Sequence, residues 1–444
     1  MYCLVINGNP ESSKFDDFLD DFLGGLAAGG HSTNRLDLRN MSIGYCTGCW
    51  SCWWKSPGRC SIRDDMESLL GEIARADLVV WASPLVHGNV TALLKKAQDR
   101  FIPMIHPYLC IRHGEFHHRA RYSHYPDIGL IVEPASADDD ADIALVRELF
   151  RRFSLNALGA LALFATISTP PEKILAMAES RASPPPASVP EIAAPRMAPP
   201  KRCERTLFLN GSPRGRESNS RLLISWLLEG YGEAVGAPDP ASIPIFDLAR
   251  RAERAAQHRA LLDAEEIVLV TPLYTDSVPG IVKDFLESLA GLDPAAIRGK
   301  RLAFVIQSGF PEPLHSETAA LWLARFCEKR GFAYAGTLVR GGVEGIRVQP
   351  ESWLRGIKKD FRSAGRELAT AGIFSNSLRR KVAGRRTMGP TTRLVYPLLS
   401  LTGITNFYWN MMLKKHGAFA RRFDAPYGRA FGNSRNRPAA VPGR

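Results

Sequence analysis

Four cysteines near the N-terminus lie close enough together to share one chemical task. Cys46, Cys49, Cys52 and Cys60 follow the pattern C-x2-C-x2-C-x7-C. Soft thiolate ligands favour iron–sulfur clusters or zinc, so the spacing is typical of a metal loop. Three tryptophans crowd the same loop, which leaves a thiol-based or purely structural loop as the alternative.

A second group of polar residues follows an apolar run in the middle of the chain. The segment NGSPRGRESNS, residues 210–220, precedes a helix-like stretch. Free N–H groups at a helix N-terminus attract an anion, and an arginine adds a charge-assisted donor. We therefore predict a phosphate site, or else a helix cap without a ligand. Its residues would be Ser212, Arg214, Ser218, Asn219 and Ser220.

A loop further along the same half can complete a binding site. The sequence TPLYTD follows a predicted strand, and ligands of open α/β sheets bind outside the carboxyl ends of strands. A flat aromatic ring can lie against this loop while its N–H groups bond the polar edge of the ring. The residues concerned are Pro272, Leu273, Tyr274, Thr275 and Asp276.

Both segments recur in weaker form near the N-terminus, so the chain contains a repeat of domain size. A Pro ends an apolar run in each copy, and a Lys follows eleven residues later, Lys95 and Lys283. The first copy has no Arg in its phosphate-type loop. It either binds a second ligand or serves its cysteine loop or assembly. The matching residues are Asn9, Ser12 and Ser13 for a phosphate, and Pro84, Leu85, Val86, His87 and Gly88 for a ring.

The second copy resembles the flavodoxin-like NAD(P)H-dependent FMN reductases over about residues 205–345. Its phosphate-type loop is similar to their G-S-x-R-x-x-S-x-[ST] motif, with a slightly different spacing before Ser220. Its TPLYTD loop and the later Lys are similar to their ring motif. The resemblance implies FMN as cofactor, NAD(P)H as co-substrate and a ring contact from a further segment. That segment is QSGFPE, with Gln307, Ser308 and Gly309.

The cysteine loop resembles that of the iron–sulfur flavoproteins in the same superfamily. The sequence DDM shortly after Cys60 adds to the likeness, which implies a [4Fe–4S] cluster held by the four cysteines. Related proteins keep a similar C-x-G-C-x-x-C…C…DD loop without an established cluster. The choice between a cluster, zinc and a thiol loop therefore stays open.

Alternating apolar runs and helical patterns predict the positioning elements. We expect two tandem doubly wound α/β domains, flavodoxin-like, at residues 1–169 and 204–350. A Pro-rich, disordered linker would span residues 170–203, which hold nine prolines in 34 residues. A mostly helical extension would follow at 351–444.

The basic charge of the chain belongs to that extension. Residues 351–444 hold 19 Lys and Arg against four Asp and Glu, a formal charge of +15, which leaves −3 for the other 350 residues of a chain at +12. The apolar stretch 394–413 is interrupted by Pro and Gly, so we expect a helix packed on the second domain rather than a transmembrane span. Docking on a membrane surface is the alternative.

An insert in the first copy holds five of the ten histidines, within residues 106–126. One hypothesis is a metal site from His113, Glu115, His117 and His118. A second is a positively charged, aromatic lid over the flavin that recognises a pyridine nucleotide phosphate through Arg119 and Arg121. A third is an ordered structural loop.

These patterns predict an FMN-dependent NAD(P)H oxidoreductase that delivers electrons to a small-molecule or protein acceptor. No Ser-His-Asp or paired-carboxylate pattern favours a hydrolase. The alternative is a non-enzymatic redox-sensing or binding protein that uses its cysteine loop. The chain opens without a signal peptide, so we expect the cytoplasm. We expect no specific nucleic acid partner, and either a homo-oligomer or a pseudo-dimer of the two domains.

Overall fold

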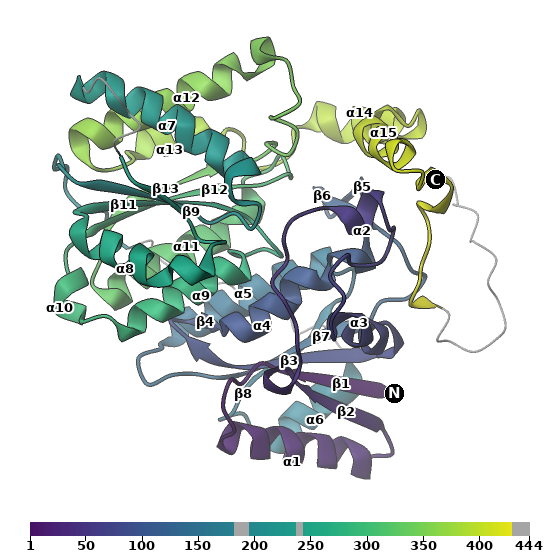
Figure 1. The fold of residues 1–444 in the computed structure, drawn as a ribbon. Coiled ribbons are helices and arrows are strands. Elements are labelled where there is room, and N and C mark those ends of the chain that lie inside the picture. Colours follow the sequence, from purple (N-terminus) through teal and green to yellow (C-terminus); the bar gives the residue numbers. More distant parts are fainter. Residues whose placement is uncertain (182–194, 237–242, 429–444) are drawn as a thin grey trace.

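The computed structural model describes residues 1–181, 195–236 and 243–428. Residues 1–181 form an α/β domain around a mainly parallel sheet (Figure 1). Its strands are β1 (Tyr2–Asn7), β2 (Ser32–Asp37), β3 (Leu78–Val86), β4 (Asn89–Val90), β7 (Asp127–Glu133) and β8 (Leu161–Thr166). Its helices are α1 (Lys14–Ala28), α2 (Ser51–Trp54), α3 (Met66–Arg75), α4 (Ala92–Gln98), α5 (Asp140–Asn156) and α6 (Pro171–Ser180).

The second domain repeats this plan. Its strands are β9 (Thr206–Asn210), β10 (Ile245–Asp247), β11 (Glu266–Pro272), β12 (Arg301–Gln307) and β13 (Ala333–Arg340). Its helices are α7 (Asn219–Val235), α8 (Arg254–Asp263), α9 (Gly280–Ser288), α10 (Pro294–Ile297), α11 (Leu314–Arg330), α12 (Glu351–Ala371) and α13 (Asn376–Ala383).

Strand order confirms the predicted fold class. The parallel strands run β2-β1-β3-β7-β8 in the first domain and β10-β9-β11-β12-β13 in the second. Both are the 2-1-3-4-5 order of flavodoxin-like folds, which places ligands at the carboxyl edge where the order reverses. Every residue of β11 and β12 is buried, because helices cover both faces of the sheet.

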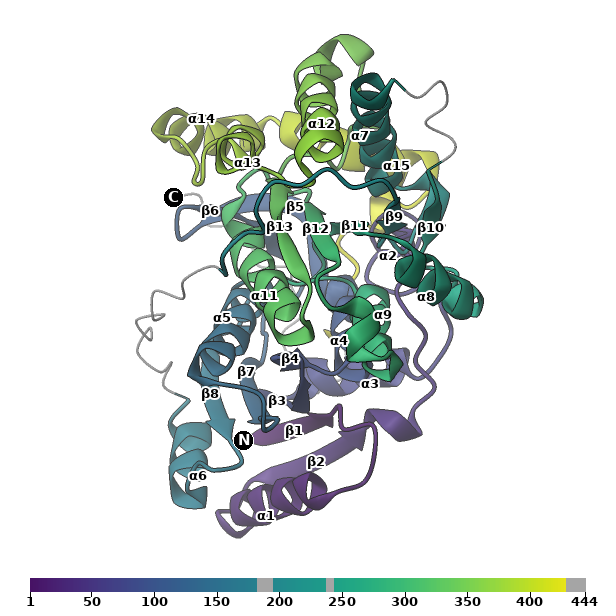
Figure 2. The same ribbon diagram turned by 90° about the vertical axis from the view of Figure 1, so that its left-hand side faces the viewer.

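Four helices fill the space between the two sheets. Figures 1 and 2 show α4 and α5 of the first domain lying against α9 and α11 of the second. The two repeats therefore pair within one chain, as the pseudo-dimer prediction proposed. The outer face of each sheet is covered by other helices, α1 and α6 on one side of the molecule and α7, α12 and α13 on the other (Figure 1). α3 packs on the same face of the first sheet as α4 and α5, and α8 on the same face of the second sheet as α9 and α11.

The repeated lysines connect the two copies. Lys95 Nζ donates to the carbonyl of Tyr274 at 2.9 Å, and Lys283 Nζ donates to the carbonyl of Val86 at 2.9 Å. Tyr274 and Val86 are each the second residue after the strand-end Pro of their own copy. We call the loops at residues 84–88 and 272–276, which were predicted to contact a ring, the ring-type loops. Each lysine thus holds the ring-type loop of the other domain, so the contacts between the two domains are reciprocal.

The predicted linker is wrong for residues 171–180. They form α6, which packs on β8 and α1 with Ile174 and Ala178 buried. Pro171 fits because the first turn of a helix needs no N–H from that residue. Residues 182–194 of the same prediction lie outside the described residues.

The C-terminal segment also differs from its prediction. Residues 394–413 do not form one helix on the second domain, but two, α14 (Pro390–Leu401) and α15 (Phe407–Lys415). Gly403, at φ 74°, breaks the helix between them. They pack on the first domain, α14 against β5 (Ile105–Arg112) and α15 against α2. β5 and β6 (Glu115–Ala120) form a hairpin from the histidine insert. Among the described residues, no helix is long and apolar enough to cross a bilayer.

Candidate active site

The loop after β11 forms a tight turn with an unusual backbone. Tyr274 and Ser277 exchange two backbone hydrogen bonds of 2.8 and 3.0 Å. Thr275 and Asp276 between them have φ of 43° and 60°, a region that β-branched residues rarely adopt. Such strain persists only where the surroundings fix the backbone, and it is typical of functional sites.

The first domain supplies that fixation. Lys95 Nζ donates to Thr275 Oγ1 at 2.7 Å, and Asn156 Nδ2 donates to both carboxylate oxygens of Asp276 at 3.0 and 2.9 Å. Burial raises the pKa of the Asp276 carboxyl, against the opposing charge of Arg152. The conformation of the ring-type loop therefore depends on residues that the other repeat contributes.

A cavity of about 210 Å³ lies beside this turn. Residues 272–276 and 307–309 line it, so the structure brings together the two segments predicted to contact a ring. Much of the remaining wall comes from other parts of the chain. It includes Trp50 and Trp53 of the cysteine loop, His118 of the hairpin, Asn156 of α5 and Trp409 of α15.

The predicted phosphate residues gather at the start of α7, on the same edge of the sheet. Ser212, Ser218, Asn219 and Ser220 are all at least 96% buried. Ser218 caps the helix by accepting from the Arg221 N–H at 3.1 Å. The N–H groups of the first helical turn have no intrahelical partner, and they point to this loop. Asn219 Oδ1 is buried without a hydrogen-bond partner among the described residues.

Arg214 connects the phosphate-type loop to the cysteine loop. A Cβ at Gly48 would lie 2.9 Å from Arg214 Cγ and 2.5 Å from Tyr274 Oη, so a larger residue there would force these side chains to move. Gly48 also has φ of 63°, which glycine adopts without strain. Burial raises the pKa of the nearby Glu344 carboxyl to about 7, while the charge of Arg214 opposes the shift.

The four predicted metal cysteines line one small cavity, which shares Trp50, Ile102 and Tyr274 with the larger one. The Gly48 N–H donates to Cys46 Sγ at 3.4 Å, and Arg100 Nη2 donates to Cys60 Sγ at 3.3 Å.

The loop suits a metal by the chemistry of its donor atoms, but not by a completed arrangement of ligands. The donor set is entirely thiol, and N–H···S bonds of this kind accompany iron–sulfur centres. Within the described ranges, however, no three His, Cys, Asp or Glu side chains are gathered as metal ligands. Burial raises the pKa of Cys46 to about 12. Burial also acts on Cys49, but hydrogen bonds with Ser51 and Ser61 outweigh it and lower that pKa to about 7.

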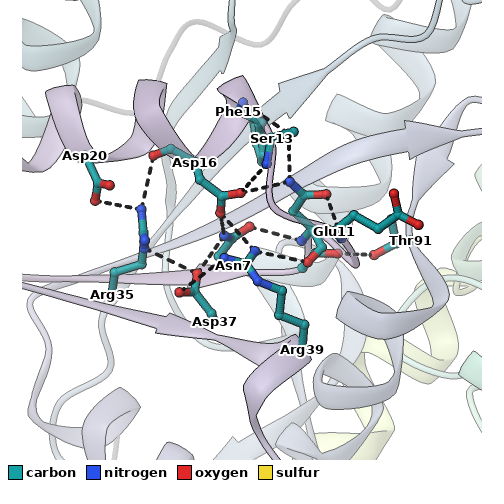
Figure 3. Close-up of polar contacts among 12 residues, drawn as sticks. Asn7, Glu11, Ser13, Phe15, Asp16, Asp20, Arg35, Asp37, Arg39 and Thr91 are labelled. Carbon is teal, nitrogen blue, oxygen red and sulfur yellow. Dashed lines mark hydrogen bonds and ion pairs between the residues drawn. The ribbon is translucent and has the colours of Figure 1, made fainter.

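The corresponding loop of the first domain contains its own carboxylate (Figure 3). Asp16 of α1 accepts from the Ser13 N–H at 2.9 Å, from Asn9 Nδ2 at 3.2 Å and from Arg39 at 2.9 Å. Glu11 occupies the position that Arg214 holds in the second copy, counted from the Asn-Gly that both copies have at the strand end. Asp16 and Glu11 therefore both place negative charge where a bound phosphate would need positive charge.

The ring-type loop of the first domain is engaged by the second domain. The carbonyl of His87 accepts from Trp322 Nε1 at 2.8 Å, and its ring packs on Phe326. Burial and the charge of Lys283 lower the pKa of His87 to about 3, so its ring stays neutral. A Cβ at Gly88 would lie 2.9 Å from the Asp142 carboxylate. Val86 and His87 thus contact the second domain, whereas Gly88 lies against Asp142 of α5 in its own domain. Pro84 and Leu85 belong to the end of β3, and Ser12 is exposed.

Part of the histidine insert belongs to a buried polar network beside the cavity. Arg152 donates to Glu115 and to His315 Nδ1, each at 2.7 Å. His117 Nδ1 lies 2.7 Å from Asn156 Oδ1, the residue that also holds the ring-type loop. Burial lowers the pKa of His315 to about 3. The insert contains a hydrogen-bonded hairpin, and the four residues of the metal hypothesis are not gathered as ligands in the described chain. Because Leu109 and His118 line the cavity, the lid hypothesis stays a prediction beside that of a structural loop.

Comparison with known proteins agrees with this architecture. Residues 1–120 and 205–324 match the family model of the NADPH-dependent FMN reductases. The two matches together cover more than half of the chain, one in each domain. The chain therefore belongs to the NADPH-dependent FMN reductase family.

Individual relatives match a smaller part of the chain than the family model does. An iron–sulfur flavoprotein from Archaeoglobus fulgidus is 36% identical over 107 residues, which are 24% of this chain and 48% of that protein. A second, from Methanocaldococcus jannaschii, is 31% identical over 105 residues, 23% of this chain and 53% of that protein. The chain thus matches about half the length of these relatives. An FMN-dependent NADH-azoreductase from Bacillus anthracis, solved with FMN, aligns with 37% of this chain and all of its own at 16% identity and a TM-score of 0.29.

Proposed function

We propose that the chain is an FMN-dependent NAD(P)H oxidoreductase with one FMN, bound by the second domain. The observation that carries the proposal is the pairing of two features at one sheet edge. The buried start of α7 offers N–H groups and Arg214 to a phosphate, and the cavity beside the strained Tyr274–Ser277 turn can take the ring. When bound, FMN supplies the hydride chemistry.

The residues of this chain would bind and orient the cofactor. Ser212, Ser220 and the first-turn N–H groups would hold the phosphate, with Arg214 as its charged partner. The turn at 274–277 would fix one edge of the ring, and residues 307–309 would approach another. Trp50, Trp53 and Trp409 would exclude water, since their rings pack within 4.6 to 6.0 Å of one another.

Anaerobic titration with NADPH and NADH tests this proposal. We expect the purified yellow protein to lose its flavin absorbance as either reductant is added, and to regain it with an artificial acceptor. Folded protein that carries no flavin and takes up none would contradict the proposal. That outcome would favour the non-enzymatic alternative, in which the cysteine loop senses oxidants.

We further propose that Cys46, Cys49, Cys52 and Cys60 hold a [4Fe–4S] cluster. The all-thiol donor set, the N–H···S contacts and the relatives described as iron–sulfur flavoproteins support it. Such a cluster would let a two-electron donor serve one-electron acceptors. The shared wall residues Trp50 and Tyr274 would separate it from the flavin.

Iron and sulfide assays on anaerobically prepared protein test the cluster. We expect about four irons per chain, on the ligand count of such clusters. The Cys52→Ser variant should lose iron, whereas Cys110→Ser, at a thiol outside the loop, should keep it. Iron-free protein with intact flavin would contradict the cluster without touching the flavin proposal, and zinc in place of iron would select the other metal.

A further inference from the structure

Two short helices near the C-terminus leave a large apolar surface uncovered by the described chain. Leu401 is 84% exposed, Leu394 72% and Phe407 67%. Soluble proteins rarely expose contiguous apolar surface without a partner. We call this surface the outer face of α14–α15, and define it by Leu394, Leu398, Leu401, Ile404, Phe407 and Met411.

The inner sides of the same helices are already occupied. Tyr396 packs edge-on against Phe116 of the hairpin, with ring centroids 4.5 Å apart. Trp409 packs against Trp53 at 5.2 Å, and Leu413 is buried. The pair is therefore anchored on the first domain through one side. Figure 1 shows α14 and α15 projecting from the body of the molecule.

The segment that carries this face is strongly basic. Residues 376–423 contain ten Lys and Arg and no Asp or Glu. Only Lys381 and Arg386 among the ten form an ion pair with a carboxylate that the structure describes, namely with Asp360 and Glu317. Lys414 and Lys415 follow Met411 on α15 and are exposed. An apolar face in a segment rich in cationic side chains matches a partner surface that is both apolar and anionic.

We propose that the outer face of α14–α15 docks on an anionic lipid surface. Helices that lie in the interface need apolar side chains on one face and cations around them, not the length of a membrane span. Cations near such a surface add binding through the negative potential of the headgroups. Trp409 and Leu109 of the hairpin, which packs on α14, both line the 210 Å³ cavity, so docking would bring that cavity beside the lipid.

Vesicle co-sedimentation of the full chain tests this proposal. We expect binding to vesicles of phosphatidylcholine mixed with phosphatidylglycerol, and little to phosphatidylcholine alone. Binding should weaken as salt is raised, because the Debye length shrinks. Absence of binding to the mixed vesicles at low salt would overturn the proposal, and so would equal binding to both vesicle types.

Variants on and away from this face distinguish binding through the face from nonspecific hydrophobic binding. Leu398→Asp with Leu401→Asp should weaken vesicle binding by at least about tenfold, since two apolar side chains that would insert into the lipid are lost. Val348→Asp is the matched control, because Val348 is 67% exposed elsewhere in the molecule, and it should bind normally. Unchanged flavin content would show that both proteins are folded. If the double variant instead converts a dimer to a monomer without changing vesicle binding, the face is an interface between copies and the proposal fails.

Discussion

At the scale of single residues, the two copies differ in the sign of charge beside a shared backbone. The Asn-Gly at each strand end is common to both, yet Arg214 follows in one loop and Glu11 in the other. We expect Arg214→Ala to weaken FMN binding about 10- to 100-fold, the range for a hydrogen bond to a charged group. Glu11→Ala is the matched change in the other copy and should leave affinity unchanged. Fluorescence titration of the apoprotein measures both, and equal affinities would contradict the assignment.

Asp16 is the residue through which the first loop satisfies its own donors. Burial opposes its charged form, but the Ser13 N–H, Arg39 and Asn7 outweigh burial and lower the pKa of the carboxyl. A lowered pKa means that stability is present above the ordinary Asp pKa and lost as pH falls through the folded value.

We therefore expect Asp16→Asn to reduce the free energy of unfolding by about 1–3 kcal/mol near neutral pH. The difference in the free energy of unfolding between the variant and the unmodified protein should become smaller in acid. There the native carboxyl is protonated and therefore neutral, like the amide that replaces it. Urea unfolding at the two pH values gives the comparison. Asp17→Asn, at an exposed position of the same helical turn, serves as control. A gap that stays constant with pH would refute the electrostatic account.

At the scale of elements, α4 and α9 make equivalent contacts with unequal consequences. Lys95 holds the turn that we assign to the flavin, whereas Lys283 holds the turn of the first domain, to which we assign no flavin. Lys95→Met should therefore lower both thermal stability and FMN affinity, and Lys283→Met should lower stability alone.

The loss of stability should be larger for Lys95→Met. Its partner Asp99 is 3% exposed, whereas Glu287, the partner of Lys283, is 24% exposed and keeps access to water. Leaving a buried charge unpaired costs about 3–5 kcal/mol. Thermal melts and flavin titration of the two variants decide the matter, and a matching loss of flavin affinity in both would speak against one flavin site.

The elements were largely predictable, and the reasons for the misses are physical. Continuous apolar runs ending in polar loops predicted both sheets, because strands buried on two faces carry that pattern. α6 was missed since its prolines resemble a linker, although Ile174 and Ala178 have helical spacing. The split of α14 from α15 could have been expected from Gly403.

The site was only half predictable. The TPLYTD motif predicted residues 272–276, and the family resemblance predicted residues 307–309. Asn156 and Trp409 line the cavity, and Lys95 bonds the turn beside it, through tertiary contacts that no local spacing encodes. Asp16 left a readable signal, the capping box formed with Ser13, but not its role inside the loop. The repeat identified Lys95 and Lys283, whereas the exchange between domains required the structure.

At the scale of the whole molecule, the chain is a pseudo-dimer whose two halves contribute different parts of the proposed site. One half keeps the phosphate-type loop and the ring turn. The other contributes the cysteine loop, the hairpin and α5, which close the cavity over that turn. On our proposal of one FMN per chain, a duplicated fold would lose one of two equivalent sites while the remaining site draws its wall from both copies.

The number of FMN molecules bound per chain tests this division most directly. Equilibrium titration of the apoprotein should give one FMN per chain, lost on combining Arg214→Ala with Ser220→Ala and kept on combining Glu11→Ala with Ser12→Ala. Two FMN per chain, or loss of FMN from the variant altered in the first domain, would contradict the account.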